Sequence, residues 1–278
     1  MYQDDVKTYF KDKAEEYDLV EKQSYWRLSD KLLWDSIVTY VIPLLPEKFS
    51  FCDAGGGTGR WSLKLLENYS DSFGVTLDLS PEMLNEAIKK KEKNHLDNRW
   101  KCELGDLEDL TEFSKIHSPF DFVFNFHNVI GFIKDPRHFL AELSKIAKQN
   151  GIICSFVPNA YHATFFNIKN GVLDEAEKSL NGYGRFTTQM PYIHMFTPKQ
   201  IAKLMEEANF EVLLCTGFPS LIYPGYSETQ LRGQTQALSD LLEDEETFNK
   251  IFSLEKQALK NEDIASRGNN IFIVARKK

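Results

Sequence analysis

From residue 49 onward, short apolar segments alternate with segments whose apolar residues recur at helical spacing. The segments typical of strands are residues 49–54, 73–77, 100–104, 120–126, 152–157, 212–216 and 271–275. Strands that alternate with helices favour a parallel sheet covered by helices on both faces. The sequence therefore predicts an α/β fold, with a doubly wound, mostly parallel sheet of seven strands.

The helices between these strands have recognisable starts. Ser80 and Asp135 each precede a proline, which suits a capping side chain followed by the first helical position. Thr197, with a glutamine three residues later, has the spacing of a capping box. We also expect a helix over residues 107–116, and a helix after Asp135 that ends with Gly151 as its C-terminal cap.

Three segments do not follow the alternation. Residues 1–45 are rich in aromatic side chains and predict a helical cap, residues 158–196 show no clear period, and residues 218–266 begin as a loop and become an acidic helix. Long segments of this kind inside a compact domain are usually functional, and open α/β sheets bind ligands at the carboxyl ends of their strands. We predict one domain, 1–278, in which these three segments cover a substrate site.

The charge balance bears on the partners of the protein. The sequence has 33 Lys and Arg against 41 Asp and Glu, a net charge of −8, which disfavours binding to a nucleic-acid backbone. The longest apolar run, Ile37–Leu45, is too short to cross a bilayer, and the N-terminus has no secretory signal. We expect a cytoplasmic protein with no nucleic-acid or membrane partner.

The four cysteines, at positions 52, 102, 154 and 215, lie in four different predicted strands and form no CxxC pair. Metal ligation needs clustered ligands. We therefore expect four buried free thiols.

A glycine-rich turn over residues 53–59, reading DAGGGTG, joins the first predicted strand to the first helix. Glycine lets the backbone approach a ligand closely, and a helix N-terminus offers unpaired N–H groups. Asp78 ends the second strand and is placed to accept hydrogen bonds from both hydroxyls of a ribose. Asp106 ends the third strand and is placed to accept the amine of an adenine. Each acid alone is also typical of a helix cap, but the ordered set predicts an adenosine-type ligand.

The spacing of the glycines distinguishes between adenosine ligands. The dinucleotide fingerprint is G-x-G-x-x-G/A. If it begins at Gly55, its last position is Arg60, where a small residue must pack; if it begins at Gly57, its last position is Ser62, which nearly matches the pattern. Asp53 would oppose a pyrophosphate, whereas it suits a ligand that carries an ammonium group. No Lys-Ser/Thr pair follows the glycines, which excludes a Walker A loop.

Five segments carry a resemblance to a known family: CDAGGGTG (52–59), GVTLDLSPEML (74–84), GDLEDL (105–110), FDFVFNFHNVIGFIKDP (120–136) and HMFTPKQIAKLMEEANFEV (194–212). In these segments the sequence resembles the class I S-adenosylmethionine-dependent methyltransferases, in particular their small-molecule, type 11-like branch. The resemblance implies S-adenosylmethionine as the cofactor. It implies Gly55, Gly57, Gly59, Asn125 and Phe126 at the methionine part, Asp53 at its ammonium, Tyr17 at its carboxylate, Asp78 at the ribose, Asp106 and Leu107 at the adenine, and Leu79 as a further cofactor-binding residue.

Two departures narrow the chemistry that the resemblance implies. The segment that starts at Asn125 lacks the Pro-Pro-aromatic signature of enzymes that methylate nucleobase amines. Asn125 and Asn159 also stand where metal-dependent catechol O-methyltransferases have acids, so no metal is expected.

Methyl transfer needs alignment of the acceptor, and an acceptor hydroxyl also benefits from a base. The candidate bases are His127, His194 and Tyr192, with His162 as a further histidine; a structural role is equally favoured for His194 and more favoured for His162. We predict methyl transfer to nitrogen or oxygen of a small molecule or short peptide. The alternatives are an NAD(P)-dependent oxidoreductase and a cofactor-binding module without turnover.

Overall fold

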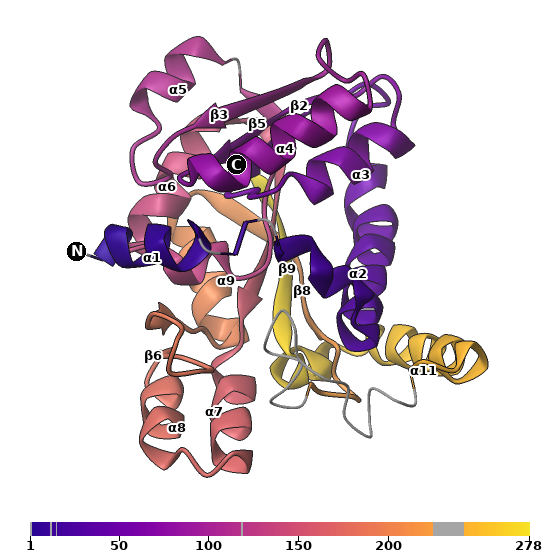
Figure 1. Cartoon of the computed structure of the whole chain (residues 1–278), viewed down its shortest axis with the longest axis vertical. Helices are drawn as coiled ribbons and strands as arrows, with labels where there is room; N and C mark the ends of the chain where they lie inside the picture. Colours follow the sequence, from indigo (N-terminus) through magenta and orange to yellow (C-terminus); the bar gives the residue numbers. More distant parts are fainter. Residues whose placement is uncertain (1, 12, 15, 118, 225–241) are drawn as a thin grey trace.

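The computed structural model describes residues 2–11, 13–14, 16–117, 119–224 and 242–278. Within these residues, seven strands form one sheet in the order β3-β2-β1-β4-β5-β9-β8 (Figure 1). The strands are β1 (Ser50–Ala54), β2 (Phe73–Asp78), β3 (Trp100–Leu104), β4 (Phe120–Asn125), β5 (Ala147–Pro158), β8 (Phe210–Phe218) and β9 (Asn270–Lys277). Neighbouring strands from β3 to β5 pair in parallel, whereas β9 is antiparallel to both β5 and β8. The predicted α/β class and the mostly parallel sheet are confirmed.

Helices connect the strands: α3 (Arg60–Asn68), α4 (Pro81–Lys93), α5 (Thr111–Ile116), α6 (Pro136–Ile146) and α9 (Pro198–Glu207). The predicted caps are confirmed, since Ser80 accepts a backbone N–H at the start of α4, Asp135 accepts two at the start of α6, and Thr197 forms a reciprocal capping box with Gln200.

Two predicted helix boundaries are wrong. The helix expected from residue 107 begins only at Thr111, because Asp106 instead accepts the N–H of Glu108 and forms a turn. The helix expected to reach Gly151 ends at Ile146, because Ala147 is extended and pairs with Phe120 at the start of β5. A side chain at position 151 would lie 2.8 Å from the backbone oxygen of Lys148, so the glycine serves a tight backbone approach within β5 and not a helix cap.

The sheet is buried on both faces. One face is packed with aromatic rings from the strands, among them Phe51, Phe124 and Phe272, against α2 (Ser24–Ser36) and α3. The other face carries mainly aliphatic side chains, such as Val123 and Ile153, against α6 and α9. Burial on both faces is expected of central parallel strands.

All four cysteines are free, as expected, but only two of them are buried. Cys52 and Cys154 lie in the central strands β1 and β5, whereas Cys102 and Cys215 lie on the outer strands β3 and β8 and are half-buried. The described residues contain no group of His, Cys, Asp and Glu side chains that could hold a metal ion.

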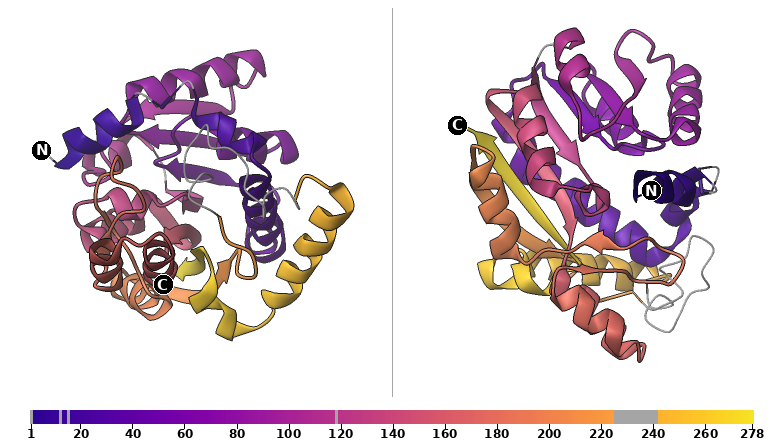
Figure 2. Two further views of the ribbon diagram at one scale, coloured as in Figure 1. Left: turned by 60° about the horizontal axis from the view of Figure 1, so that its bottom comes forward. Right: turned by 90° about the vertical axis from the view of Figure 1, so that its left-hand side faces the viewer.

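The N-terminal segment is helical, as predicted. It contains α1 (Tyr2–Lys11), η1 (Tyr17–Lys22), α2, η2 (Ile37–Val41) and η3 (Ile42–Leu44). Helix α1 lies beside α4 (Figure 2), and Lys11 is 4.0 Å from Glu82 on that helix. Phe10 packs edge-on against Phe132 of η4 (Val129–Phe132), with ring centroids 5.1 Å apart. These contacts place the end of α1 over the loop that follows β4.

Residues 158–196, which show no clear period in sequence, contain a helical hairpin of α7 (Ala160–Lys169) and α8 (Leu173–Leu180), followed by the short strands β6 (Tyr183–Gly184) and β7 (Ile193–His194). The hairpin projects at the opposite end of the molecule from α5 (Figure 1). Helix α7 has no recognisable period because apolar side chains occupy its exposed face, such as Phe165 and Ile168, as well as its buried face, such as Phe166.

The last segment, 218–266, contains α11 (Glu245–Ala258) and η6 (Glu262–Arg267), and its residues 225–241 lie outside the described residues. Glu255 of α11 is fully buried and accepts hydrogen bonds from the backbone N–H groups of residues 220, 221 and 222. Tyr223 next to them donates its hydroxyl to the backbone oxygen of Arg267. A buried carboxylate is stable only with such partners, and here it fixes residues 220–224 beside the sheet.

No helix in the described part of the chain combines the length and the apolar character that spanning a membrane requires.

Candidate functional site

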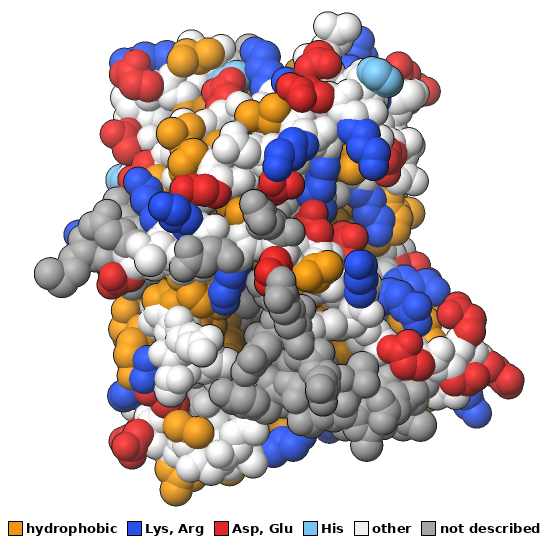
Figure 3. Space-filling view, in the orientation of Figure 1, with side chains coloured by type: hydrophobic (Ala, Val, Ile, Leu, Met, Phe, Trp, Pro, Cys, Tyr) orange, Lys and Arg blue, Asp and Glu red, His pale blue; other side chains and the backbone are white. Residues whose placement is uncertain are grey.

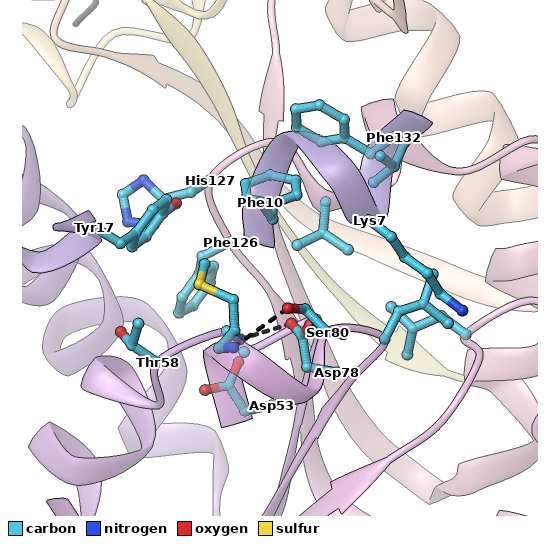
Figure 4. Close-up of a pocket in the computed structure, with 18 of the residues that line it drawn as sticks. Lys7, Phe10, Tyr17, Asp53, Thr58, Asp78, Ser80, Phe126, His127 and Phe132 are labelled. Atoms are coloured by element: carbon cyan, nitrogen blue, oxygen red, sulfur yellow. Dashed lines mark hydrogen bonds between the residues drawn. The ribbon is translucent and has the colours of Figure 1, made fainter. Parts of the chain in front are cut away.

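A cavity of roughly 1000 Å³, open solvent at its mouth included, lies at the carboxyl ends of β1, β2, β3 and β4. We call it the first cavity. The loops after these strands supply most of its wall, and α1, Tyr17 and the first turns of α3 and α4 supply the rest (Figure 4). Its lining residues are Val6, Lys7, Phe10, Tyr17, Asp53, Gly55, Gly56, Gly57, Thr58, Arg60, Trp61, Asp78, Leu79, Ser80, Met83, Asp106, Leu107, Glu108, Phe126, His127, Val129, Phe132 and Ile133.

The carboxylate of Asp78 is fixed at the wall of this cavity. One oxygen accepts the N–H of Gly57 at 2.8 Å, and the other accepts the N–H of Ser80 at 2.9 Å (Figure 4). Gly57 reaches Asp78 with a φ of +53°, a conformation that glycine adopts without strain. A carboxylate has about four acceptor positions, so further positions are available to a ligand's hydroxyl groups. Burial raises the pKa of Asp78, which makes additional donors favourable.

Asp53 is buried below the glycine turn. Its carboxylate accepts the hydroxyl of Ser62 at 2.8 Å, and desolvation raises its pKa to about 7. A Cβ at Gly56 would lie 2.4 Å from the Asp53 carboxyl carbon, so the turn can pass over this acid only with a glycine there. A desolvated carboxylate with one hydroxyl partner gains energy from a cation.

Asp106 and Leu107 form the wall of the cavity after β3. Asp106 accepts the backbone N–H of Glu108 at 2.9 Å, and Leu107 is buried. The loop therefore presents an acid beside an apolar side chain, an arrangement that suits the polar edge and the flat face of a heterocycle.

His127 is held by two donors on a single ring nitrogen. Nη2 of Arg60 and Nε1 of Trp61 each lie 2.9 Å from Nε2 of His127. Both groups only donate, so Nε2 accepts and the proton of the neutral ring is on Nδ1. Burial and the charge of Arg60 lower the pKa of His127 to about 4. A general base needs a lone pair that can take up a proton. The Nε2 lone pair of His127 is already hydrogen-bonded, so it is not available for the role of general base that the sequence suggests.

The other two candidate bases line neither this cavity nor its neighbour described below. His194 of β7 is half-buried and contacts the backbone oxygen of Lys134 through Nε2 at 3.2 Å. Tyr192 donates its hydroxyl to Glu175 at 2.8 Å within the base of the helical hairpin. In the short β6–β7 pair, Tyr183 lies opposite His194, and its ring contacts the rings of both Tyr192 and His194.

Two residues expected at the cofactor also lie outside the lining. Gly59 caps α3, and a Cβ there would lie 2.4 Å from the ring of Trp100, so this glycine permits close packing of the helix against β3. Asn125 is buried at the end of β4 and donates to the hydroxyl of Ser155 at 2.8 Å. The remaining predicted cofactor residues, Tyr17, Asp53, Gly55, Gly57, Asp78, Leu79, Asp106, Leu107 and Phe126, all line the first cavity.

A second cavity of about 1110 Å³, its open mouth included, adjoins the first. The two share Phe10, Tyr17, Arg60, His127 and Phe132 in their linings. The rest of the second cavity is lined by Tyr9, Lys13, Val20, Trp26, Asn128, His162, Phe166, Phe186, Thr187, Met190, Pro224, Asn269 and Asn270. The segments 1–45, 158–196 and 218–266 therefore all contribute to one aromatic chamber.

Sequence reasoning missed several lining residues. Lys7 of α1 and Lys13 just after it carry no motif, and Phe132 lies in the segment 120–136, in which nothing distinguishes it as a lining residue. The only available signal was the aromatic content of the N-terminal segment, which indicates packing but not which side chains reach a cavity.

The chain is similar to known proteins over most of its length. The model of a family described as "Methyltransferase domain" matches residues 25–214. The tRNA 5-carboxymethoxyuridine methyltransferase of Escherichia coli K12 is 22% identical over 251 residues, which are 90% of this chain and 88% of that protein. The trans-aconitate 2-methyltransferase of Deinococcus radiodurans is 24% identical over 165 residues, 59% of each protein. The structure of magnesium protoporphyrin IX methyltransferase from Synechocystis, solved with bound S-adenosylhomocysteine, superposes with a TM-score of 0.57 at 14% identity and covers 100% of each chain.

We expect His127 to stay neutral, with its proton on Nδ1, between pH 5 and 8, because a proton on Nε2 would face the two donors of Arg60 and Trp61. Long-range ¹H–¹⁵N NMR of histidine-labelled protein measures this tautomer directly. A His127 ring that gains a proton near pH 6.5 would contradict the assignment.

Proposed function

This chain belongs to the class I S-adenosylmethionine-dependent methyltransferases, and we propose that it methylates nitrogen or oxygen of a small molecule or short peptide held in the second cavity. The single observation that carries the proposal is the shared wall between the two cavities. S-adenosylmethionine supplies an electrophilic methyl group on a sulfonium. A cofactor in the first cavity and an acceptor in the second meet at Phe10, Tyr17, His127 and Phe132, as methyl transfer requires.

The residues of the first cavity fit the parts of this cofactor. We assign the ribose to Asp78, because its carboxylate is fixed by two N–H groups and retains acceptor positions. The buried Asp53 suits the ammonium of the methionine part, and the hydroxyl of Tyr17 suits its carboxylate. The adenine fits between Asp106 and Leu107. Phe126, Leu79 and the backbone of the glycine turn complete this set.

The protein's contribution to the reaction is alignment and the exclusion of water. Holding two reactants in the reactive geometry can contribute about 7–11 kcal/mol to catalysis. The aromatic side chains of the three covering segments, such as Phe166 and Phe186, restrict water in the second cavity. His127 presents a neutral ring at the shared wall, so we assign it to orienting the acceptor through its Nδ1 proton. His194 and Tyr192 remain sequence predictions that this arrangement does not use.

A small acceptor is favoured over a nucleic acid by the surface and by the cavity. One relative is named for a modified tRNA nucleoside and another for trans-aconitate, a small acid. In this chain, however, the net charge is −8, and acidic and basic side chains are interspersed on the face drawn in Figure 3, outside its grey atoms. A polyphosphate backbone is bound by gathered positive charge.

We expect label from S-[methyl-³H]adenosylmethionine to enter small molecules and not tRNA. The purified protein is incubated with either a low-molecular-mass extract or total tRNA, and the label in each fraction is counted after separation by size. Transfer to tRNA, with none to the small molecules, would replace this proposal with a nucleic-acid methyltransferase.

Substitution Asp78→Ala should weaken S-adenosylmethionine binding roughly ten- to a hundredfold, because hydrogen bonds to charged groups contribute about 1.5–3 kcal/mol. Isothermal titration calorimetry measures the affinity. Asp71→Ala removes an exposed acid outside both cavities and should leave it unchanged. An unaltered affinity in Asp78→Ala, with the fold intact by circular dichroism, would disprove the ribose assignment.

The affinity for S-adenosylmethionine should rise with pH through about 7, because Asp53 must lose its proton to face an ammonium and burial raises its pKa to about 7. Below that pH the affinity should fall by about tenfold per unit, since the carboxyl is protonated in the free protein. Calorimetry between pH 5.5 and 7 tests this. 5′-Methylthioadenosine lacks the ammonium group, so its affinity should stay constant over the same range; equal pH dependence for both ligands would refute the role of Asp53.

A further inference from the structure

The described lining of the second cavity contains cations but no acid. None of its 18 described lining residues is Asp or Glu, whereas Lys13 and Arg60 are cations. The charge of Arg60 is compensated by its ion pairs with Asp30 and Glu21, which do not line the cavity. The ammonium of Lys13 therefore decides the electrostatic character of the chamber.

Lys13 has no counter-charge among the described residues. Its Nζ lies 3.5 Å from the centroid of the Tyr9 ring, and no described carboxylate is within ion-pair distance of it. Desolvation alone lowers the pKa of Lys13 to about 8. A half-buried ammonium over an aromatic face gains more from an anion than a hydrated surface lysine does, because the local dielectric constant is low.

His162 provides a second group with unused hydrogen-bonding capacity. Its side chain is buried, 4% exposed, and its Nε2 has no hydrogen-bond partner among the described residues. Aromatic rings surround it, with the centroid of Tyr223 at 5.0 Å and that of Phe166 at 6.4 Å. Buried polar atoms are normally satisfied, so this nitrogen is available to a polar group of a bound acceptor.

Neither histidine among the described lining residues is an effective base. The Nε2 lone pair of His127 is engaged by two donors. His162 is surrounded by rings, and burial lowers its pKa to about 3, so it holds a proton poorly. An alcohol or phenol would have to lose its proton without help from these histidines, and a cationic amine would be repelled by the ammonium of Lys13. A carboxylic acid is already ionised at neutral pH and meets both conditions.

We propose that the acceptor is a carboxylate on a flat apolar body and that the product is its methyl ester. This inference rests on the proposed function. A carboxylate oxygen donates a lone pair to the methyl carbon, the bond from that carbon to sulfur breaks, and its electron pair stays on sulfur. The products are the neutral ester and S-adenosylhomocysteine, and no proton is transferred.

The roles of the chain's residues follow from their positions in the cavity. Lys13 attracts the carboxylate, and the Nε2 proton of the matching His162 tautomer donates to it or to a second polar group of the ligand. Phe10 and Phe132, which belong to both cavities, pack against the apolar body next to the shared wall. Lys13 and His162 are therefore binding residues that select the acceptor.

The test uses three probes that share one ring system: 2-naphthoate, 2-naphthol and 2-(aminomethyl)naphthalene, whose amine is protonated at neutral pH. Each is titrated calorimetrically into the full-length protein saturated with S-adenosylhomocysteine, and a set of aromatic and aliphatic carboxylates follows. We expect naphthoate to bind at least tenfold more tightly than the amine or the phenol. Lys13→Met should weaken naphthoate binding roughly ten- to a hundredfold. Lys11→Met, two residues away and exposed, is the matched control and should change nothing.

The chemical nature of the product gives an independent readout. With S-[methyl-³H]adenosylmethionine and the carboxylates that bind, mild alkali should release the label as volatile methanol, because esters hydrolyse whereas N-methyl groups and aryl ethers do not. Equal or tighter binding of the amine, unchanged naphthoate affinity in Lys13→Met, base-stable label, or no binding by any carboxylate would overturn the proposal. Failure of S-adenosylhomocysteine itself to bind would instead disprove the proposed function.

Discussion

Arg60 is the interaction centre on which the arrangement of both cavities depends. It begins α3 directly after the glycine turn, forms an ion pair with Asp30 of α2, and donates to His127 after β4. The guanidinium of Arg60 thus connects α2 of the N-terminal segment, the helix after the glycine-rich turn, and His127 in the wall that the two cavities share. Its charge is stable there because a carboxylate compensates it, and breaking such a buried pair typically costs about 3–5 kcal/mol.

The same contacts determine what chemistry the site can perform. Because Arg60 and Trp61 occupy Nε2 of His127 in the shared wall, we assign His127 to orienting the acceptor and not to removing its proton. A methyltransferase without a base depends on an acceptor that is nucleophilic on arrival. Lys13, which has no counter-charge among the described residues, then favours an acid over a cationic amine, so one arrangement of donors accounts for both the proposed role of His127 and the proposed acceptor.

The elements that sequence predicted well are those with a local physical cause. Strands buried on both faces read as continuous apolar runs, and the caps at Ser80 and Thr197 depend on side chains only a few residues away. Helix α7 escaped prediction because its exposed face is also apolar, and the end of α6 was misplaced because Gly151 serves β5. In the site, the predicted cofactor residues that follow strand ends line the first cavity, whereas Gly59 lies against Trp100.

The sequence by itself determined the fold class and the proposed cofactor site, because parallel strands that alternate with helices bring their carboxyl ends, with Asp53, Asp78 and Asp106, to one edge of the sheet. Only the tertiary structure decided which side chains surround the acceptor. Lys13 and His162 are far apart in sequence and have no shared motif, yet they line one chamber. Long-range packing of the three covering segments brings these two side chains together. It also removes water from the Lys13 ammonium and the His162 imidazole, on which their proposed selection of the acceptor depends.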